Sequence, residues 1–496
     1  MKASVMTLAM NSGAMPVHAT PIQAPTANRS LRFLAILVSA AVLGGCASFS
    51  PDGGFAAVEK TAKDRLGKDV QWARSDADQD SIAKRVSEIL SKPLTVDDAV
   101  QVALLNNRGL QATFQELGIT ESEVVQAGRL PNPGFSFGRS SRGDEREIER
   151  GLHFNIARLI ALPFIGQMET RRFEQTRGMV AMSVLTLAAD TRKAYYNALA
   201  AEQTVRYMRQ VMQAANASAE LARRMEQVGN FNKLQRAREQ VFYADASLNF
   251  ARSEQAQRAT RERLTRLLGA WGTQTQFSLP ERLPDLPKDV TELPDIERVA
   301  LAQRLDVQGA KLAAEQTARN LGLTRATRFV NVLELGLIRN SSNEAPTQRG
   351  WEIGFELPLF DWGGARVARA EAVYMQTVHR AAETAINARS EVREAYTGYR
   401  LAFDIARHHR DEIVPLRQRI AEENVLRYNG MLIGVFELLA DARAQIVSVN
   451  NAIESLRDFW LAEANLQTTL TGTSVGGLAA MRAGGDGMSG AAAAAH

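Results

Sequence analysis

A proline-free segment with a heptad rhythm constrains this chain more than any other feature of its sequence. Between about Met168 and Val228, small and apolar residues recur at alternating steps of three and four. The recurring positions are Val184, Leu187, Thr191, Ala194, Ala198, Ala201, Val205, Met208, Met212, Ala215, Ala219 and Ala222. A rhythm held this long predicts a coiled-coil helix. At ~1.5 Å per residue that helix would be roughly 90 Å long, which is more than a single globular core requires.

The sequence also contains an internal duplication. Residues 103–112 align with 300–309, residues 161–166 with 356–361, and residues 237–241 with 442–446, at a nearly constant offset. The second half repeats the heptad rhythm at Val378, Ala381, Ala385, Ala388, Val392, Ala395, Tyr399, Ala402 and Ala406. Each half therefore predicts the same order: a helix, two strands, a very long helix, a turn and a long return helix.

Each very long helix is predicted to end at a glycine-marked turn. The first turn contains Val228 and Gly229, and the second contains Asn429 and Gly430. A return helix follows each turn, so both turns should lie at one end of the molecule. The apolar positions of the return helices are Leu234, Ala237, Val241, Ala244, Leu248 and Ala251 in the first half, and Leu439, Ala442, Ile446, Val449, Ile453, Leu456 and Trp460 in the second.

Four short segments between the helices have the period of strands. The residues that alternate cleanly with polar ones are Leu152, Phe154 and Ile156, then Trp351, Ile353, Phe355 and Leu357; Phe135, Phe137 and residues 330–338 alternate less regularly. Segments of about ten residues that are apolar on one face fit membrane β-strands, and periodicity alone equally allows a half-buried soluble sheet. In lipid, four strands would leave open edges, which three copies of the chain could close.

The N-terminal region has the pattern of a secretory signal peptide that ends at a lipidation site. Arg29 and Arg32 precede the apolar run 33–43, which is too short to span a bilayer as a helix. Small residues then lead to Cys46, the single cysteine of the chain, as in the bacterial lipobox, where the cysteine is lipidated. We therefore expect a covalent lipid such as palmitate on Cys46, with a buried free thiol as the alternative. No aspartate follows Cys46, which favours the outer membrane by analogy with such lipoproteins.

Composition and motifs argue against an enzyme and against a nucleic-acid-binding protein. The net charge is +4, but the basic residues are interleaved with acids and form no basic block. His408 and His409 are adjacent, so on a helix they diverge and cannot share a metal. The chain has no phosphate-binding glycine loop with lysine, no nucleophile elbow and no second cysteine. We expect no catalytic residue, no metal site and no cofactor beyond the lipid on Cys46.

These patterns predict six regions along the chain. They are a signal peptide with lipobox (1–46), an N-terminal extension along the helical region (47–92), a first structural repeat (93–272), a Pro-rich linker (273–293), a second structural repeat (294–472) and a tail rich in Gly, Ala and Ser (473–496) that we expect to be disordered.

The motifs resemble those of the outer-membrane efflux proteins, the TolC-like family. The residues that carry the resemblance are 94–99 with Ala103-Leu104 and Asn106-Asn107, 127–133 before the first strand, and 358–364 at a strand-to-helix junction. The resemblance covers residues 93–472 in order, including the duplication. The first half departs at its own junction, where Ile165-Gly166-Gln167 stands in place of an Asp-Trp-Gly-Gly type of turn.

The resemblance implies a mainly α fold with a small β part. Long antiparallel coiled-coil helices would form a helical barrel, and four strands per chain would contribute to a trimeric twelve-stranded transmembrane β-barrel. It further implies a homotrimer in the outer membrane that carries cargo from an inner-membrane pump and a periplasmic adaptor (membrane fusion) protein. Residues 48–92 would lie along the outside of the helices, as in lipidated members.

The resemblance also assigns roles to the two turns and to a nearby acidic pair. Val228, Gly229, Asn429 and Gly430 match the position of the family's adaptor-docking tips, and glycine also permits positive φ in a tight turn. Glu437 and Asp441 lie one helical turn apart just after the second turn, where acids in this family line the constricted end of the pore. Three copies would form an acidic ring that selects cations. The spacing here is four where the family pattern has three, and a surface pair that bridges to Arg443 is the alternative.

The leading hypothesis is thus a passive outer-membrane duct that works with a pump and an adaptor and performs no catalysis. The alternative from another class is a lipid-anchored periplasmic coiled-coil structural protein without a pore. A periplasmic adaptor is a third hypothesis, but its small β-rich lipoyl-like insertion between two helices is missing from this sequence.

Overall fold

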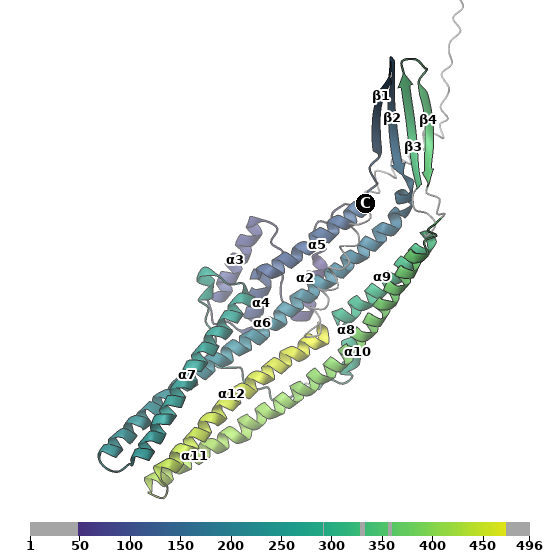
Figure 1. Cartoon of the computed structure of the whole chain (residues 1–496). Helices are drawn as coiled ribbons and strands as arrows, with labels where there is room; N and C mark the ends of the chain where they lie inside the picture. The colour runs from purple at the N-terminus through teal and green to yellow at the C-terminus, as the bar shows by residue number, and fades with distance from the viewer. Residues whose placement is uncertain (1–47, 291, 328–332, 356–359, 473–496) are drawn as a thin grey trace, which may run out of the picture. The chain divides into compact units, whose positions relative to one another are not determined.

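The computed structural model describes residues 48–290, 292–327, 333–355 and 360–472, and Figure 1 shows how their helices and strands are arranged. Cys46, the expected signal peptide and the tail 473–496 lie outside the described residues, so the lipid on Cys46 and the disorder of the tail stay predictions. Within the described part of the chain, no helix combines the length and apolarity that crossing a membrane requires.

The helices and strands occur twice in the same order. The first repeat contains α4 (Val96–Asn106), α5 (Arg108–Ala127), β1 (Gly134–Arg142), β2 (Glu145–Asn155), α6 (Ile156–Gln227) and α7 (Lys233–Leu268). The second contains α8 (Ile296–Gln303), α9 (Leu305–Thr327), β3 (Leu333–Ser342), β4 (Gln348–Phe355), α10 (Gly364–His408), the π-helical turn η2 (His409–Ile413), α11 (Val414–Asn429) and α12 (Val435–Thr471). The predicted duplication is confirmed, but each repeat opens with two helices where one was expected.

The extra helix break lies at the same aligned position in both repeats. Asn107 ends α4 with extended backbone angles and caps α5, because its Oδ1 accepts a hydrogen bond from the Leu110 N–H at 3.0 Å. Arg304, which aligns with Asn107, is likewise extended between α8 and α9, with φ −65° and ψ 127°. Apolar periodicity continues through both positions, so the sequence pattern alone did not reveal the break.

The first very long helix begins earlier than the sequence indicated. The Asn155 side chain accepts a hydrogen bond from the Arg158 N–H at 2.8 Å and caps α6, so Ile156 is helical and not the end of a strand. Pro163 then lies inside α6, and the expected junction at residues 161–166 is wrong for the first repeat. With 72 residues, α6 would extend about 108 Å at 1.5 Å per residue.

The second very long helix contains a local change of helix type. The π-helical turn η2 separates α10 from α11, and Pro415 occupies the first turn of α11. Proline has no N–H and its ring clashes with the carbonyl four residues earlier, so a widened turn just before it lets the helix axis continue. His408 and His409 lie at this turn, where the exposed His408 ring is 3.1 Å from Glu412.

The long helices pack as antiparallel pairs through the predicted heptad positions. α7 packs back along α6, while α12 packs along α11, α10 and α6 (Figure 1). The heptad positions of α6 that are buried are Val184, Thr191, Ala194, Ala198, Val205, Ala215, Ala219 and Ala222. The apolar stripe of α7, in contrast, is exposed: Leu234 is 61% exposed, Val241 59% and Leu248 49%. The face of α7 that packs within the chain carries Glu239, Phe242 and Ala246 instead.

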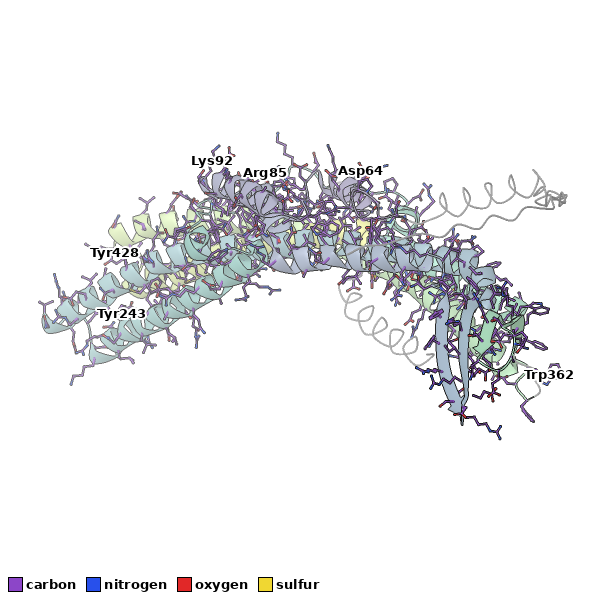
Figure 2. All side chains as sticks on the ribbon, turned by 90° about the horizontal axis from the view of Figure 1, so that it is seen from above. Asp64, Arg85, Lys92, Tyr243, Trp362 and Tyr428 are labelled. Carbon is purple, nitrogen blue, oxygen red and sulfur yellow. The ribbon has the colours of Figure 1, made fainter. Side chains whose placement is uncertain are left out.

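The N-terminal extension and the linker both pack against helices. α2 (Ala56–Leu66) buries Val58 and Ala62 in a cluster with residues of α4, α5 and α6, and α3 (Asp76–Leu90) packs on α4. Asp64, Arg85 and Lys92 lie on one side of the long helices in Figure 2. The linker, after the short η1 (Gly272–Thr275), buries Phe277, Leu283 and Leu286.

The strands form one antiparallel sheet in the order β1-β2-β3-β4. The first hairpin comes from the first repeat and the second hairpin from the second repeat, so β2 and β3 join the two repeats. β1 and β4 are the two edges of the sheet.

Candidate functional site

The sheet has one apolar face. Side chains alternate along a strand, and residues that pair across strands share a face. Phe135 pairs with Leu152, Leu152 with Leu337, and Leu337 with Trp351, so these four form a row across the sheet. We call this side the apolar face; its apolar residues are Phe135, Phe137, Ile148, Leu152, Phe154, Leu333, Leu335, Leu337, Trp351, Ile353 and Phe355.

The opposite face is acidic. The strand residues Glu145, Glu147, Glu149, Glu334 and Glu352 all lie on this side, which we call the acidic face. His153 is on the same face, with its Nδ1 3.6 Å from a carboxylate oxygen of Glu352. The rest of the face carries small residues, such as Gly151 opposite Ser136, together with larger ones that include Arg142 and Ile338. This segregation matches the predicted two-sided strands.

Neither face of the sheet is covered by the rest of the described chain. Among the residues of the four strands, only Gly151 and Gly336 are buried. Trp351 is 70% exposed and Phe135 69%. Near the helix end of the sheet, Phe164 and Trp362 are also exposed, and Figure 2 shows Trp362 beside the strands. A half-buried soluble sheet, the alternative left open by periodicity, would instead pack its apolar face on a core.

The two helical turns lie at the same end of the helices and expose apolar side chains. Gly229 has φ +82°, as expected for a glycine in a tight turn. Gly430 does not, because its φ is −79° and the left-handed residue of the second turn is Met431, at φ +58°. Val228 is 71% exposed and Met431 93%. Asn429 is the last residue of α11 and is exposed as well.

The two acids after the second turn have different surroundings. Glu437 lies in the first turn of α12 with an exposed side chain. Asp441 accepts a hydrogen bond from the Asn424 side chain of α11, within the same helical hairpin. Neither acid pairs with Arg443, which binds Glu239 instead, so the alternative of a surface bridge to Arg443 is not what the described side chains form.

A buried polar contact joins the two repeats near the turns. Glu239 on α7 is 1% exposed. Its Oε1 accepts a hydrogen bond from Arg443 Nη2 of α12 at 3.0 Å, and its Oε2 accepts one from the Ser218 hydroxyl of α6 at 2.9 Å. The Arg443 guanidinium also lies 4.3 Å from the ring centre of Phe242. We call Ser218, Glu239 and Arg443 the inter-repeat clamp.

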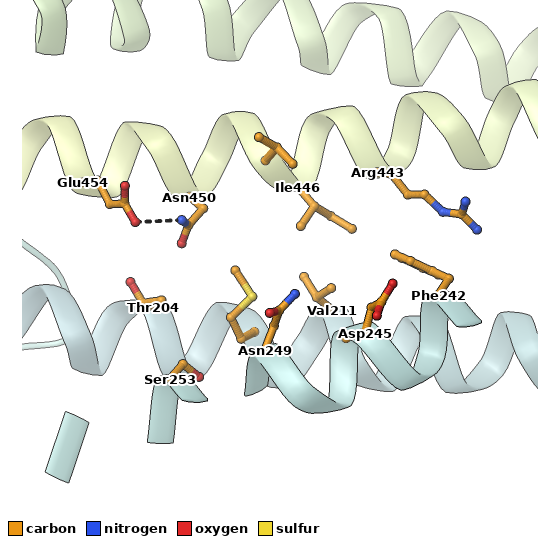
Figure 3. Close-up of a pocket in the computed structure, with 13 residues that line it drawn as sticks. Thr204, Val211, Phe242, Asp245, Asn249, Ser253, Arg443, Ile446, Asn450 and Glu454 are labelled. Atoms are coloured by element: carbon orange, nitrogen blue, oxygen red, sulfur yellow. Dashed lines mark hydrogen bonds between the residues drawn. The ribbon is translucent and has the colours of Figure 1, made fainter. Parts of the chain in front are cut away.

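The clamp adjoins a cavity between α6, α7 and α12. The cavity has a volume of about 450 Å³, and its lining includes Met208, Phe242 and Ile446 (Figure 3). At the other end of the cavity, the Asn450 side-chain amide donates a hydrogen bond to the Glu454 carboxylate at 3.0 Å. The sequence analysis did not predict the clamp. The available signal was Glu239, an acid on the face of α7 opposite the apolar stripe. In the described residues there is no cluster of three or more His, Cys, Asp or Glu that could hold a metal ion.

The chain has the fold of the TolC-like outer-membrane efflux channels. It superposes on the outer membrane protein VceC of Vibrio cholerae with a TM-score of 0.64 at 14% identity, covering 76% of this chain and 96% of that one. It superposes equally well on the open state of the Neisseria gonorrhoeae MtrE outer membrane channel, with a TM-score of 0.63 at 17% identity, covering 76% and 89%.

A curated relative is similar in sequence. The cobalt-zinc-cadmium resistance protein CzcC of Cupriavidus metallidurans is 24% identical over 277 residues, which is 54% of this chain. The match spans 64% of that relative, less than two thirds of its length. No protein-family model matches the chain.

Proposed function

We propose that this chain is the outer-membrane channel of a tripartite efflux or export system, a passive homotrimeric duct without catalytic activity. The observation that carries the proposal is the uncovered sheet, which has an apolar face on one side and an acidic face on the other. Lipid solvates such an apolar face, whereas water does not. The strands have 8 to 11 residues, close to the roughly 9–11 that cross a membrane.

The open edges of the sheet support a trimer. β1 and β4 cannot remain unpaired in lipid, where each unsatisfied backbone group is costly. Because the chain supplies an even number of strands, β4 of one copy can pair antiparallel with β1 of the next. Three copies then close a twelve-stranded barrel with the apolar face outward and the acidic face around the pore.

The exposed apolar stripe of α7 supports the same assembly in the helical region. Leu234, Val241 and Leu248 repeat at heptad spacing and are exposed, with no other described part of the chain packed over them. The corresponding residues of α12 include Ile453, which is buried between helices of the same chain. A second copy of the chain packed on α7 would bury this stripe, as helices of the same chain already bury Ile453 of α12.

The turns and the acidic pair have roles that follow from this placement. We propose that Val228, Gly229, Asn429 and Gly430, together with the exposed Met431, form the docking surface for a periplasmic adaptor that links the channel to an inner-membrane pump. We propose Glu437 and Asp441 as the gate at the constricted end. With three copies of the acidic face around the pore, the channel should favour cations. A lipid on Cys46 would anchor each copy in the outer membrane.

Membrane fractionation and a stripe variant test the channel. The wild-type protein should fractionate with the outer membrane, run as a heat-sensitive trimer band and conduct ions in planar bilayers. Val241→Asp should abolish the trimer band, because a charge would be buried in the stripe. Ala256→Asp, at an exposed position outside the stripe, is the matched control and should retain the trimer.

The outcomes separate the channel from its alternative. A lipid-anchored periplasmic coiled-coil protein would remain in the membrane fraction through its lipid but would show no conductance. Purified trimer that does not conduct would therefore reject the channel. For the gate, replacing Glu437 and Asp441 by alanine should raise closed-state conductance or change cation block, and unchanged conductance would remove both residues from the gate.

A further inference from the structure

The apolar face carries five arginines and no acid. Arg139, Arg146, Arg150, Arg339 and Arg349 lie on this side of the strands, while the five strand glutamates all lie on the other. Arg142 is the one strand arginine on the acidic face. This segregation does not follow from solubility, since arginines on a solvated sheet are usually placed opposite acids. The basic charge on this side therefore needs a ligand of its own.

Three of these arginines occupy one row. Arg150 pairs with Arg339, and Arg339 pairs with Arg349, so their side chains project side by side from three neighbouring strands. Neighbouring strands are about 4.8 Å apart, and like charges placed directly opposite repel each other. Among the described residues, no hydrogen bond or ion pair reaches any of the three guanidinium groups. We call these residues the arginine row.

The arginine row lies at the boundary of the apolar surface. The row of Leu337 and Trp351 is two residues away along the strands, about 7 Å, and the apolar residues continue from there toward the helices. On the other side of the arginine row, toward the hairpin turns, the face is mostly polar, with Arg139, Ser141, Arg146 and Ser341 around Ile148. Arginine facing lipid is costly at the bilayer midplane and is tolerated near an interface, so the arginine row marks an interface.

We infer that the arginine row binds the phosphate groups of lipopolysaccharide in the outer leaflet. This inference rests on the proposed function, because the hairpin turns point away from the helices and so toward the cell exterior. A guanidinium fork donates two parallel hydrogen bonds to phosphate oxygens, and a phosphate between two arginines relieves their repulsion. The acyl chains of the same lipid would then lie on the apolar residues next to the row.

The direct test is binding of lipid A to purified trimer in detergent. Diphosphoryl lipid A should raise the thermal midpoint of the wild-type trimer and remain bound in native mass spectrometry. Replacing Arg150, Arg339 and Arg349 by glutamine should reduce lipid retention at least about tenfold, since each charge-assisted contact is stronger than a neutral one. Arg339→Gln alone, the central position, should give a partial loss and guards against misfolding of the triple variant. Arg142→Gln, on the acidic face, is the matched control and should bind like wild type.

Several results would overturn the inference. The inference fails if the triple variant retains as much lipid A as the wild type. A thermal shift of the same size with inorganic phosphate, or with phosphatidylglycerol in place of lipid A, would show that the row takes other anions. If the wild-type trimer conducts ions but binds no lipid A, the lipid site is wrong and the channel proposal stands. If the wild-type protein neither reaches the outer membrane nor conducts, both proposals fail.

Discussion

Replacing Arg443 by methionine would leave the buried carboxylate of Glu239 with Ser218 as its remaining hydrogen-bond partner among the described side chains. Removing one member of a buried ion pair typically costs about 3–5 kcal/mol, because the other charge stays desolvated. The Glu239 side chain is 2% exposed, but that of Arg443 is 39% exposed, so water already weakens the pair. We therefore expect the substitution to destabilise the contact between α7 and α12 by about 2–4 kcal/mol.

Hydrogen exchange measured by mass spectrometry reports this change locally. Opening of the helices near the turns must break the inter-repeat clamp, and exchange accelerates tenfold for about every 1.4 kcal/mol of lost local stability. Peptides that cover residues 239–250 and 439–450 should then exchange roughly 30- to 700-fold faster in Arg443→Met. Peptides from β1–β4 should be unchanged, because the strands do not contact the clamp.

A matched surface pair and a double variant make the test specific. Arg427 pairs with Glu423 on α11, and both side chains are more than half exposed. Arg427→Met should therefore change exchange by less than about fivefold, as expected for an exposed ion pair worth at most about 1 kcal/mol. Adding Glu239→Gln to Arg443→Met should restore part of the protection by removing the buried charge. The reasoning is refuted if Arg443→Met behaves like Arg427→Met, or if the double variant exchanges as fast as Arg443→Met alone.

Three further predictions concern other parts of the chain. Burial raises the pKa of Tyr195 to about 12, and its hydroxyl donates to the Leu94 carbonyl at 2.9 Å; this contribution to stability should be complete below about pH 10 and be lost as the pH rises toward 12. Denaturation followed across this range should show a smaller loss in Tyr195→Phe than in the wild type, since burial also raises the pKa of Tyr196; the variant should be about 1–2 kcal/mol less stable at pH 7. Arg304 is 1% exposed and binds two carboxylates, so Arg304→Met should cost about 3–5 kcal/mol in denaturant titrations, whereas the exposed Arg298→Ala should cost less than about 0.5 kcal/mol. Cys46→Ala should abolish metabolic labelling with palmitate, and labelling that persists would contradict the lipobox.

Much of the fold could be predicted because its signals are local. The heptad positions of α6, such as Val184, Ala198 and Val205, mark a buried helical face within the sequence itself, and the structure buries them. The duplication and the two turns follow from alignment of one half with the other. The predicted helix boundaries were less accurate than the predicted order of elements. A single capping side chain, Asn107 or Asn155, decides where a helix begins, and it does so without altering apolar periodicity.

The candidate sites depended more strongly on tertiary structure. Alternation in β2 predicts that Arg150 and Leu152 share a face, but it says nothing about their neighbours. Only the register between strands from different repeats places Arg150 beside Arg339, and only the packing of α12 brings Arg443 to Glu239.

The sequence by itself therefore determined the duplicated order of elements, the long coiled-coil helices, the two turns and the alternating strands, because each depends on residues a few positions apart. The tertiary structure decided which apolar surfaces stay uncovered, namely the stripe of α7 and the apolar face of the sheet. It also decided that five of the six strand arginines lie on the face opposite the strand glutamates, across four strands. These features depend on pairing between the two halves of the chain, and periodicity within either half carries no information about that pairing.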